Sequence, residues 1–213
     1  MAITFLMDGS EHARFTLLLA HGAGAAMDSA TMTAMAKILA ESRFRVARFE
    51  FDYMASRRIS AGRKPPPRAD KLKPEFIAAI DALHAKGPLI IGGKSMGGRV
   101  ASMVSDELYA SRRIAGLLCL GYPFHPPEKP DQLRTQHLAE VKTPTLIVQG
   151  TRDVFGSREE VSSYELSKSI EILWLEDGDH DLKPRKSVSG FSAADHLKTL
   201  GAAVLSWAER AAS

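Results

Sequence analysis

The sequence has very little cysteine and no long hydrophobic run. Cys119 is its only cysteine among 213 residues, so no disulfide can form within the chain and nothing in the cysteine content indicates an oxidising compartment. No apolar run approaches the roughly 18 residues that span a bilayer, and the first residues do not resemble a secretory signal. We therefore expect a cytoplasmic protein without a membrane-spanning segment, with Cys119 in its core.

The sequence also lacks the motifs of common cofactor sites. It contains neither a G-x-G-x-x-G dinucleotide loop nor a Walker phosphate loop, and no set of its His, Cys, Asp and Glu residues has metal-ligand spacing. The net charge of +3 is small, and the most basic stretch has no interleaved aromatics, which argues against nucleic-acid binding. We expect no cofactor, no metal and no nucleic-acid partner, and the oligomeric state is left open.

What is present is the composition of a globular protein, with 45% hydrophobic and 25% charged residues. Apolar runs alternate with helix-like segments, which predicts an α/β protein with a mostly parallel sheet of about seven strands and helices on both faces, as one domain over residues 1–213. The runs LLLA, PLIIGG, IAGLLCLG and TLIVQG are continuously apolar, which is typical of central strands. The expected strands are Ile3 to Met7, Phe15 to Ala20, Arg45 to Phe51, Pro88 to Gly92, Ile114 to Gly121, Pro144 to Gly150 and Ile170 to Leu175.

Helical periodicity occurs in five segments between and after these runs. One further stretch, Asp52 to Pro74, has no such periodicity and is rich in proline and positive charge, so we expect a long loop there. The expected helices are Ser29 to Ser42, Lys73 to Lys86, Gly97 to Tyr109, Ser157 to Lys168 and Ser192 to Ala211.

The strongest functional motif is Gly93-Lys94-Ser95-Met96-Gly97, between an apolar strand and a helix. This is the nucleophile-elbow pattern, in which a tight turn places the serine in a strained backbone conformation and flanking glycines let neighbouring segments approach. We predict that Ser95 is a nucleophile.

A second motif, His21-Gly22-Ala23-Gly24, follows the strand LLLA and precedes a helix whose start is marked by Asp28 or Ser29. Small residues there allow the backbone to approach a developing negative charge. We predict an oxyanion hole formed by the N–H groups of Ala23 and Met96, and a structural role for His21 in holding the loop.

Two further turns carry a carboxylate and a histidine. Asp153 follows the strand TLIVQG, and His180 lies after the last strand in the turn EDGDHDLKP. Taken alone, Asp153 is equally well explained as a helix cap, but the order Ser, Asp, His favours a catalytic triad. Asp177, Asp179 and Asp181 are the alternative acids, although they lie too close in sequence to reach that imidazole easily.

The remaining histidines occur in helices or loops without a comparable motif. We expect each of them to be a surface residue: His12, His84, His125, His137 and His196.

Together these motifs resemble the α/β-hydrolase superfamily from Phe15 to the final helix. GGKSMGGR, HGAG, the PPP-containing loop, GTRDVFG and GDHDLKP are similar to those of small predicted bacterial hydrolases related to dienelactone-hydrolase-like esterases. They are also similar to a subunit of a eukaryotic histone acetyltransferase complex in which the fold serves as a scaffold. The resemblance implies the α/β-hydrolase fold, with a minimal lid because no long apolar insertion follows the sixth strand.

The expected function is therefore that of a serine hydrolase acting on esters or related acyl bonds of a small molecule, with no cofactor. Two alternatives remain open: a binding or scaffold protein without catalysis, and an acyltransferase using the same triad. Arg57, Arg58 and Lys94 suggest a substrate with a carboxylate or phosphate, although a solvated positive loop explains the two arginines equally well.

Overall fold

A computed structural model describes residues 3–59 and 65–212 and contains a seven-stranded sheet in the order β1-β3-β2-β4-β5-β6-β7. Neighbouring strands are parallel except at β1, which pairs antiparallel with β3. The α/β-hydrolase fold predicted from the sequence is confirmed. The strands are β1 (Leu6–Asp8), β2 (Phe15–Ala20), β3 (Phe44–Phe49), β4 (Leu89–Lys94), β5 (Gly116–Leu120), β6 (Thr145–Gly150) and β7 (Ile170–Leu175).

The four continuously apolar runs form β2, β4, β5 and β6, which are adjacent in the middle of the sheet. Every residue of these strands is buried, because helices cover both faces. Alternation along β2 distributes its side chains between two cores: Leu17 and Leu19 pack on one face, and Leu18 and Ala20 on the other. Cys119 lies in the second of these cores, as predicted.

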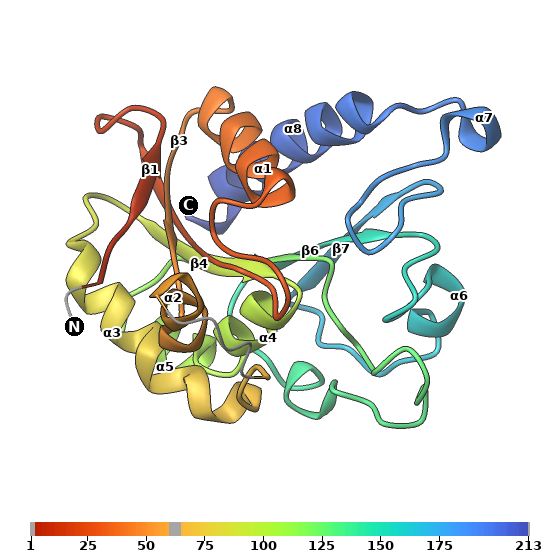
Figure 1. The fold of residues 1–213 in the computed structure, drawn as a ribbon, viewed down its shortest axis with the longest axis horizontal. Coiled ribbons are helices and arrows are strands. Elements are labelled where there is room, and N and C mark those ends of the chain that lie inside the picture. The colour runs from red at the N-terminus through yellow and green to blue at the C-terminus, as the bar shows by residue number, and fades with distance from the viewer. Residues whose placement is uncertain (1–2, 60–64, 213) are drawn as a thin grey trace.

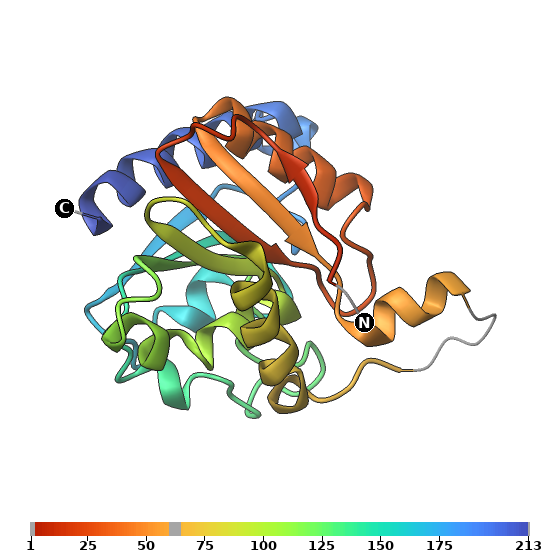
Figure 2. The same ribbon diagram turned by 90° about the vertical axis from the view of Figure 1, so that its left-hand side faces the viewer.

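Helices α1 and α8 cover one face of the sheet, and α3, α4 and α5 cover the other (Figures 1 and 2). The expected helices at 29–42 and 192–211 are present, and each begins after a serine cap, Ser29 or Ser192. No helix within the described ranges is long and apolar enough to cross a membrane. The helices are α1 (Ala30–Glu41), α2 (Asp52–Ile59), α3 (Lys73–Leu83), α4 (Met96–Ser102), α5 (Ser105–Ala110), α6 (Arg158–Val161), α7 (Lys186–Ser189) and α8 (Ala193–Ala211).

Three expected helices are shorter than predicted, and the one expected over 73–86 ends at Leu83. The segment 97–109 divides into α4 and α5, and Ser105 Oγ there donates to the carbonyl oxygen of Ser102. The helix expected over 157–168 ends at Val161, where Ser162 and Ser163 donate to backbone carbonyls of the last turn. Serine hydroxyls that bond nearby carbonyls compete with helix continuation, and periodicity does not reveal this.

The prediction of a long loop over Asp52 to Pro74 is wrong at both of its described ends. The first end is helix α2 and the other contains a 3₁₀ turn, η1 (Ala69–Leu72), while residues 60–64 lie outside the described residues. Tertiary contacts stabilise α2: Met54 is buried, and the N–H of Asp52 donates to Glu75 Oε2 at 2.7 Å. Such contacts are not visible in a local hydrophobic pattern.

Parallel strands bring their carboxyl ends to one edge of the sheet. The loops that follow β2, β4, β6 and β7 therefore meet there, and they carry, respectively, the HGAG motif, Ser95, Asp153 and His180.

Candidate active site

Ser95 lies in the tight turn between β4 and α4 with φ 52° and ψ −116°. A non-glycine residue rarely adopts this backbone conformation, and such strain is typical of functional sites. The turn is held by the N–H of Ser95, which donates to the carbonyl oxygen of Leu120 on β5 at 3.0 Å. The predicted strained serine at the end of β4 is thus present.

The flanking glycines allow α4 to pack directly against β2. A Cβ atom at Gly93 would lie 2.4 Å from the Ala20 carbonyl oxygen, and one at Gly97 would lie 2.5 Å from the same atom. Both separations are far below van der Waals contact, so any side chain at these positions would push the turn away from the sheet.

His180 joins Ser95 and Asp153 in one chain of hydrogen bonds. Its Nε2 lies 2.9 Å from Ser95 Oγ, and its Nδ1 lies 2.8 Å from Asp153 Oδ2 and 3.1 Å from Oδ1. The structure therefore brings the three predicted residues together from three separate loops. An imidazole between a hydroxyl and a carboxylate can accept the hydroxyl proton while the carboxylate stabilises the resulting positive charge.

Asp153 is fully buried, and its carboxylate accepts further hydrogen bonds that fix its position. Gln149 Nε2 donates to Oδ2 at 2.9 Å, and the N–H of Phe155 donates to Oδ1 at 2.9 Å. Gln149 is itself fixed by the N–H of Tyr122, which donates to its Oε1 at 2.7 Å. Gln149 is not among the residues predicted for the site, although an amide inside the apolar strand TLIVQG signals a buried polar partner.

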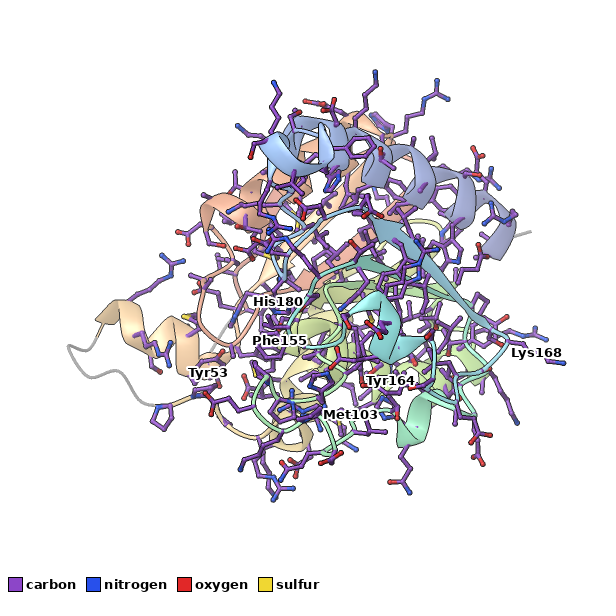
Figure 3. The ribbon with its side chains drawn as sticks, turned by 90° about the vertical axis from the view of Figure 1, so that its right-hand side faces the viewer. Tyr53, Met103, Phe155, Tyr164, Lys168 and His180 are labelled. Carbon is purple, nitrogen blue, oxygen red and sulfur yellow. The ribbon has the colours of Figure 1, made fainter. Side chains whose placement is uncertain are left out.

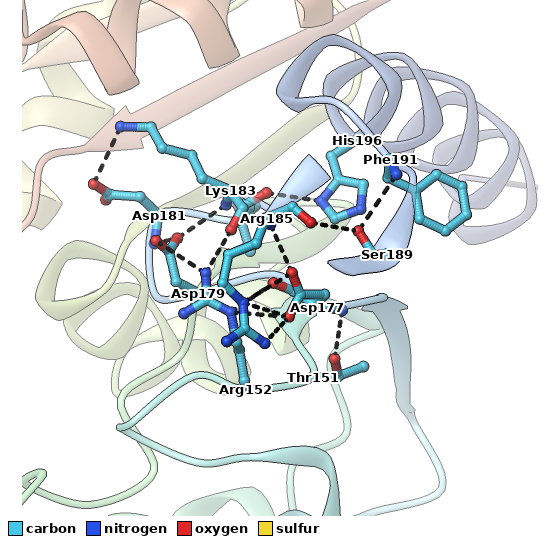
Figure 4. A network of polar contacts seen from close by, with 11 residues as sticks. Thr151, Arg152, Asp177, Asp179, Asp181, Lys183, Arg185, Ser189, Phe191 and His196 are labelled. Carbon is cyan, nitrogen blue, oxygen red and sulfur yellow. Dashed lines mark hydrogen bonds and ion pairs between the residues drawn. The ribbon is translucent and has the colours of Figure 1, made fainter. Parts of the chain in front are cut away.

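The three alternative acids bind other groups (Figure 4). Asp177 pairs with Arg152 and Arg185, and the hydrogen bond from Arg185 lowers the pKa of Asp177 to about 2. Asp179 Oδ1 accepts from the N–H of Asp181 and of Lys183, both at 2.9 Å. Among the described residues, only Asp153 presents a carboxylate to the His180 ring.

The predicted oxyanion loop lies beside the serine. Ala23, Ser95 and Met96 line the same cavity, and the N–H of Met96 is the first of α4, where helix geometry provides no acceptor. The hydroxyl of Tyr53 on α2 donates to the Ala23 carbonyl oxygen at 3.1 Å, and burial raises the pKa of Tyr53 to about 12. Tyr53 therefore fixes this loop, a role not expected from the sequence, in which Tyr53 falls within the predicted long loop.

His21 has the structural role that the sequence predicted. It is fully buried, its Nδ1 lies 2.6 Å from the Gly22 carbonyl oxygen, and its Nε2 accepts from the N–H of Phe51 at 3.2 Å. The ring therefore donates through Nδ1 and accepts through Nε2, which requires the neutral form. Burial, the largest influence, lowers the pKa of His21 below 6.5.

This buried neutral histidine predicts acid sensitivity. As pH falls through about 6.5, His21 binds a proton in the unfolded chain but not in the folded one, where its pKa is lower. The stability that neutral His21 contributes is therefore complete above that pH and is lost below it. We expect His21→Gln to lower the free energy of unfolding by about 1–3 kcal/mol at neutral pH and to weaken its decline in acid. Denaturant unfolding across this pH range tests this, with exposed His84→Gln as control. Equal slopes in wild type and His21→Gln would contradict the assignment.

The surface positions expected for the other histidines are wrong for His125 and His196, which are 1% and 4% exposed. His196 Nδ1 donates to the Leu182 carbonyl oxygen at 2.8 Å, and His125 Nδ1 donates to that of Pro126 at 2.8 Å. Packing of the loops over these rings, rather than local sequence, determines their burial.

Two cavities meet at Ser95. One, of about 530 Å³, is bounded by α4, by Pro66 to Asp70 and by Arg134; the other, of about 320 Å³, is bounded by the HGAG loop, the start of α1, Lys94 and His180. Phe155 borders both, and its ring lies against that of His180, with the centroids 4.2 Å apart and the ring planes tilted by 36° (Figure 3). A reacting group at Ser95 therefore has space on two sides, beneath an imidazole partly shielded from water.

Lys94 is buried at the second cavity, and its Nζ lies 3.7 Å from Asp181 Oδ1. Burial lowers the pKa of Lys94, and the Asp181 carboxylate opposes that effect. Its charge is thus largely offset within the protein.

The fold and this arrangement define the class of protein. Residues 13–209 match the family model described as an alpha/beta hydrolase domain, and the chain belongs to this family. The chain is therefore an α/β hydrolase.

Particular relatives are more distant. The chain is 29% identical over 163 residues to "Putative protein-lysine deacylase ABHD14B" of Pongo abelii, covering 76% of this chain and 71% of the relative. The dienelactone hydrolase of Anabaena variabilis has a similar structure, with a TM-score of 0.70 and 17% identity over 98% of this chain and 91% of the other. An α/β serine hydrolase without a lid from Xanthomonas campestris gives a TM-score of 0.67 and 18% identity over 98% and 88%.

Proposed function

We propose that the chain is a serine hydrolase that cleaves carboxylic esters or related acyl bonds of small molecules, with Ser95 as nucleophile. The observation that carries this proposal is the hydrogen-bonded chain from Ser95 Oγ through His180 to buried Asp153, at the junction of two cavities. Buried polar chains of this kind are costly to maintain and are typical of active sites.

In the proposed reaction, Ser95 Oγ attacks the acyl carbon while its proton passes to His180 Nε2. Asp153 holds the Nδ1–H and stabilises the imidazolium, and the N–H groups of Ala23 and Met96 donate to the oxyanion. His180 then protonates the leaving group as the bond from the acyl carbon breaks. Water adds to the acyl-enzyme, His180 accepts its proton, and the acid product leaves as Ser95 regains a proton.

The bond that is cleaved can also be an amide. The relative at 29% identity is named a protein-lysine deacylase, and the same nucleophile and proton transfers serve amide cleavage. Release of acetate from an acetyl-lysine peptide, compared with release from a para-nitrophenyl ester, separates the two substrate classes.

Covalent labelling with a fluorophosphonate probe tests the nucleophile. We expect wild type to be labelled on Ser95 and Ser95→Ala to be unlabelled, with the modified peptide identified by mass spectrometry. Ser102→Ala is a matched control, because Ser102 Oγ also contacts an imidazole, His137 Nε2 at 2.8 Å, but is buried. Folded wild type that does not react would favour the binding or scaffold alternative.

A further inference from the structure

Two arginines border the larger cavity beside Ser95. Arg99 lies one turn into α4, four residues after Ser95, so both face the same side of the helix start. Arg134 comes from the loop after β5, and two hydrogen bonds hold its backbone: its N–H donates to the Phe124 carbonyl oxygen at 2.7 Å, and its own carbonyl accepts from Tyr122 Oη at 2.9 Å. Neither arginine was singled out by the sequence.

Neither of these two guanidinium groups, which border a cavity at Ser95, has an acidic partner among the described residues, unlike many of the arginines elsewhere in the structure. Arg48, Arg113 and Arg210, for example, each form an ion pair with an aspartate or glutamate. Across the described ranges, no carboxylate lies within ion-pair distance of Arg99 or Arg134, and Arg99 Nε is buried without a hydrogen-bond partner. The cavity does contain one carboxylate, Asp70, but Arg68 Nε binds it at 3.2 Å.

The electrostatic environment of the cavity is correspondingly positive. Burial and then the charge of Arg99 lower the pKa of Arg134, and the same two influences lower the pKa of His137. Like charges held together in a partly buried place are unfavourable unless an anion binds between them. Arginine pairs are well suited to that task, because each guanidinium can donate two parallel hydrogen bonds to a carboxylate or phosphate.

We propose that Arg99 and Arg134 bind an oxyanionic group, a carboxylate or a phosphate, carried by the substrate whose acyl carbon Ser95 attacks. The chain is then a hydrolase of anionic esters, an inference that rests on the function proposed for Ser95. Because Arg99 follows Ser95 by about one helical turn, we expect a short spacer between the anionic group and the reacting carbon.

This assignment differs from the hypothesis based on Arg57 and Arg58. Arg58 Nη2 lies 2.7 Å from Glu50 Oε1 and 2.7 Å from Asp28 Oδ1, so its charge is already offset. Arg57 lies over the Tyr53 ring, with its guanidinium carbon 5.2 Å from the ring centroid, in a cation–π contact. Neither arginine borders the cavities at Ser95 in the described structure.

The test compares esters that differ only in charge. On the acyl side, these are the mono-para-nitrophenyl ester of adipate and its neutral methyl ester; on the leaving-group side, they are para-acetoxybenzoate, its methyl ester and para-acetoxyphenyl phosphate. We expect wild type to prefer an anionic ester. Arg99→Gln and Arg134→Gln should each lower kcat/KM for that ester by about 10- to 100-fold, mainly through KM, with neutral esters little affected.

Two further variants control for fold and charge. Arg99→Lys should restore part of the preference, whereas Arg210→Gln, at an ion pair on α8, should leave it unchanged. Activity on neutral esters tests the proposed function separately. If neutral esters are hydrolysed and the preference for anionic esters is equal in wild type and both glutamine variants, the proposed anion site is wrong, while the assignment of Ser95 as nucleophile is retained.

Calorimetric titration with adipate requires no turnover, so it tests anion binding by Arg99 and Arg134 even if no ester is hydrolysed. Binding at millimolar concentration that is lost in Arg99→Gln and Arg134→Gln supports the site. Absent binding in wild type, or equal binding in all variants, overturns it.

Discussion

Replacing His180 with alanine is expected to lower kcat/KM for para-nitrophenyl acetate by about ten thousand- to a million-fold. Nε2 of this ring is the only base within hydrogen-bond distance of Ser95 Oγ in the described part of the chain, at 2.9 Å. Without it, the hydroxyl keeps its proton and remains a weak nucleophile. Steady-state hydrolysis and fluorophosphonate labelling should both decline, and adding Ser95→Ala should cause little further loss, because the two residues act as a unit.

His137→Ala is the matched control for that experiment. His137 also contacts a serine hydroxyl, that of Ser102, but it lines neither of the two cavities at Ser95. We expect its activity to stay close to wild type once folding is verified by circular dichroism. If His180→Ala retained labelling at Ser95, the proposed base would have to be another group.

Asp153→Asn is expected to lower kcat/KM by about ten thousand-fold while preserving the fold. The carboxylate now accepts from His180 Nδ1–H, Gln149 Nε2 and the N–H of Phe155. An asparagine amide can instead donate to Nδ1, which places the ring proton on Nε2, facing Ser95 Oγ. The imidazole then has no lone pair available for the hydroxyl proton. Hydrolysis of the same ester measures the loss.

Asp179→Asn provides the comparison for this variant. Its side-chain oxygen can still accept from the N–H groups of Asp181 and Lys183, so the turn should persist. We expect less than about a threefold change in kcat/KM, as is typical for residues outside the reacting groups. A loss comparable to that of Asp153→Asn would reopen the choice of acid.

Much of this fold could be predicted because the central strands are continuous apolar runs. β2, for example, is buried on both faces, and its predicted limits, Phe15–Ala20, coincide with the observed strand. The predicted limits Ile170–Leu175 also coincide with β7, although this strand lies at the edge of the sheet and is only partly buried. Helix α2 was missed since it depends on contacts with residues distant in the chain, such as Asp52 with Glu75 and Tyr53 with Ala23. Local patterns do not contain that information.

The candidate site divides in the same way. Ser95, Asp153 and His180 were predicted because each follows a recognisable strand, and their chain order matches one known arrangement. Arg99 and Arg134 were not, because an arginine on a helix or in a loop is normally solvated or paired with an acid. Only the folded chain reveals that these two border one cavity without such a partner.

The approach of Gly93 and Gly97 to the single carbonyl of Ala20 also has a mechanical consequence. Strand β2, the end of β4 and the start of α4 pack directly against one another, with no side chain at Gly93 or Gly97 to separate them. Adaptation to a ligand is therefore expected in the other segments that border the cavities: the HGAG loop, Pro66 to Asp70 and the loops bearing Arg134 and Phe155. New substrate preferences can arise by changes in those segments while the serine itself stays in place.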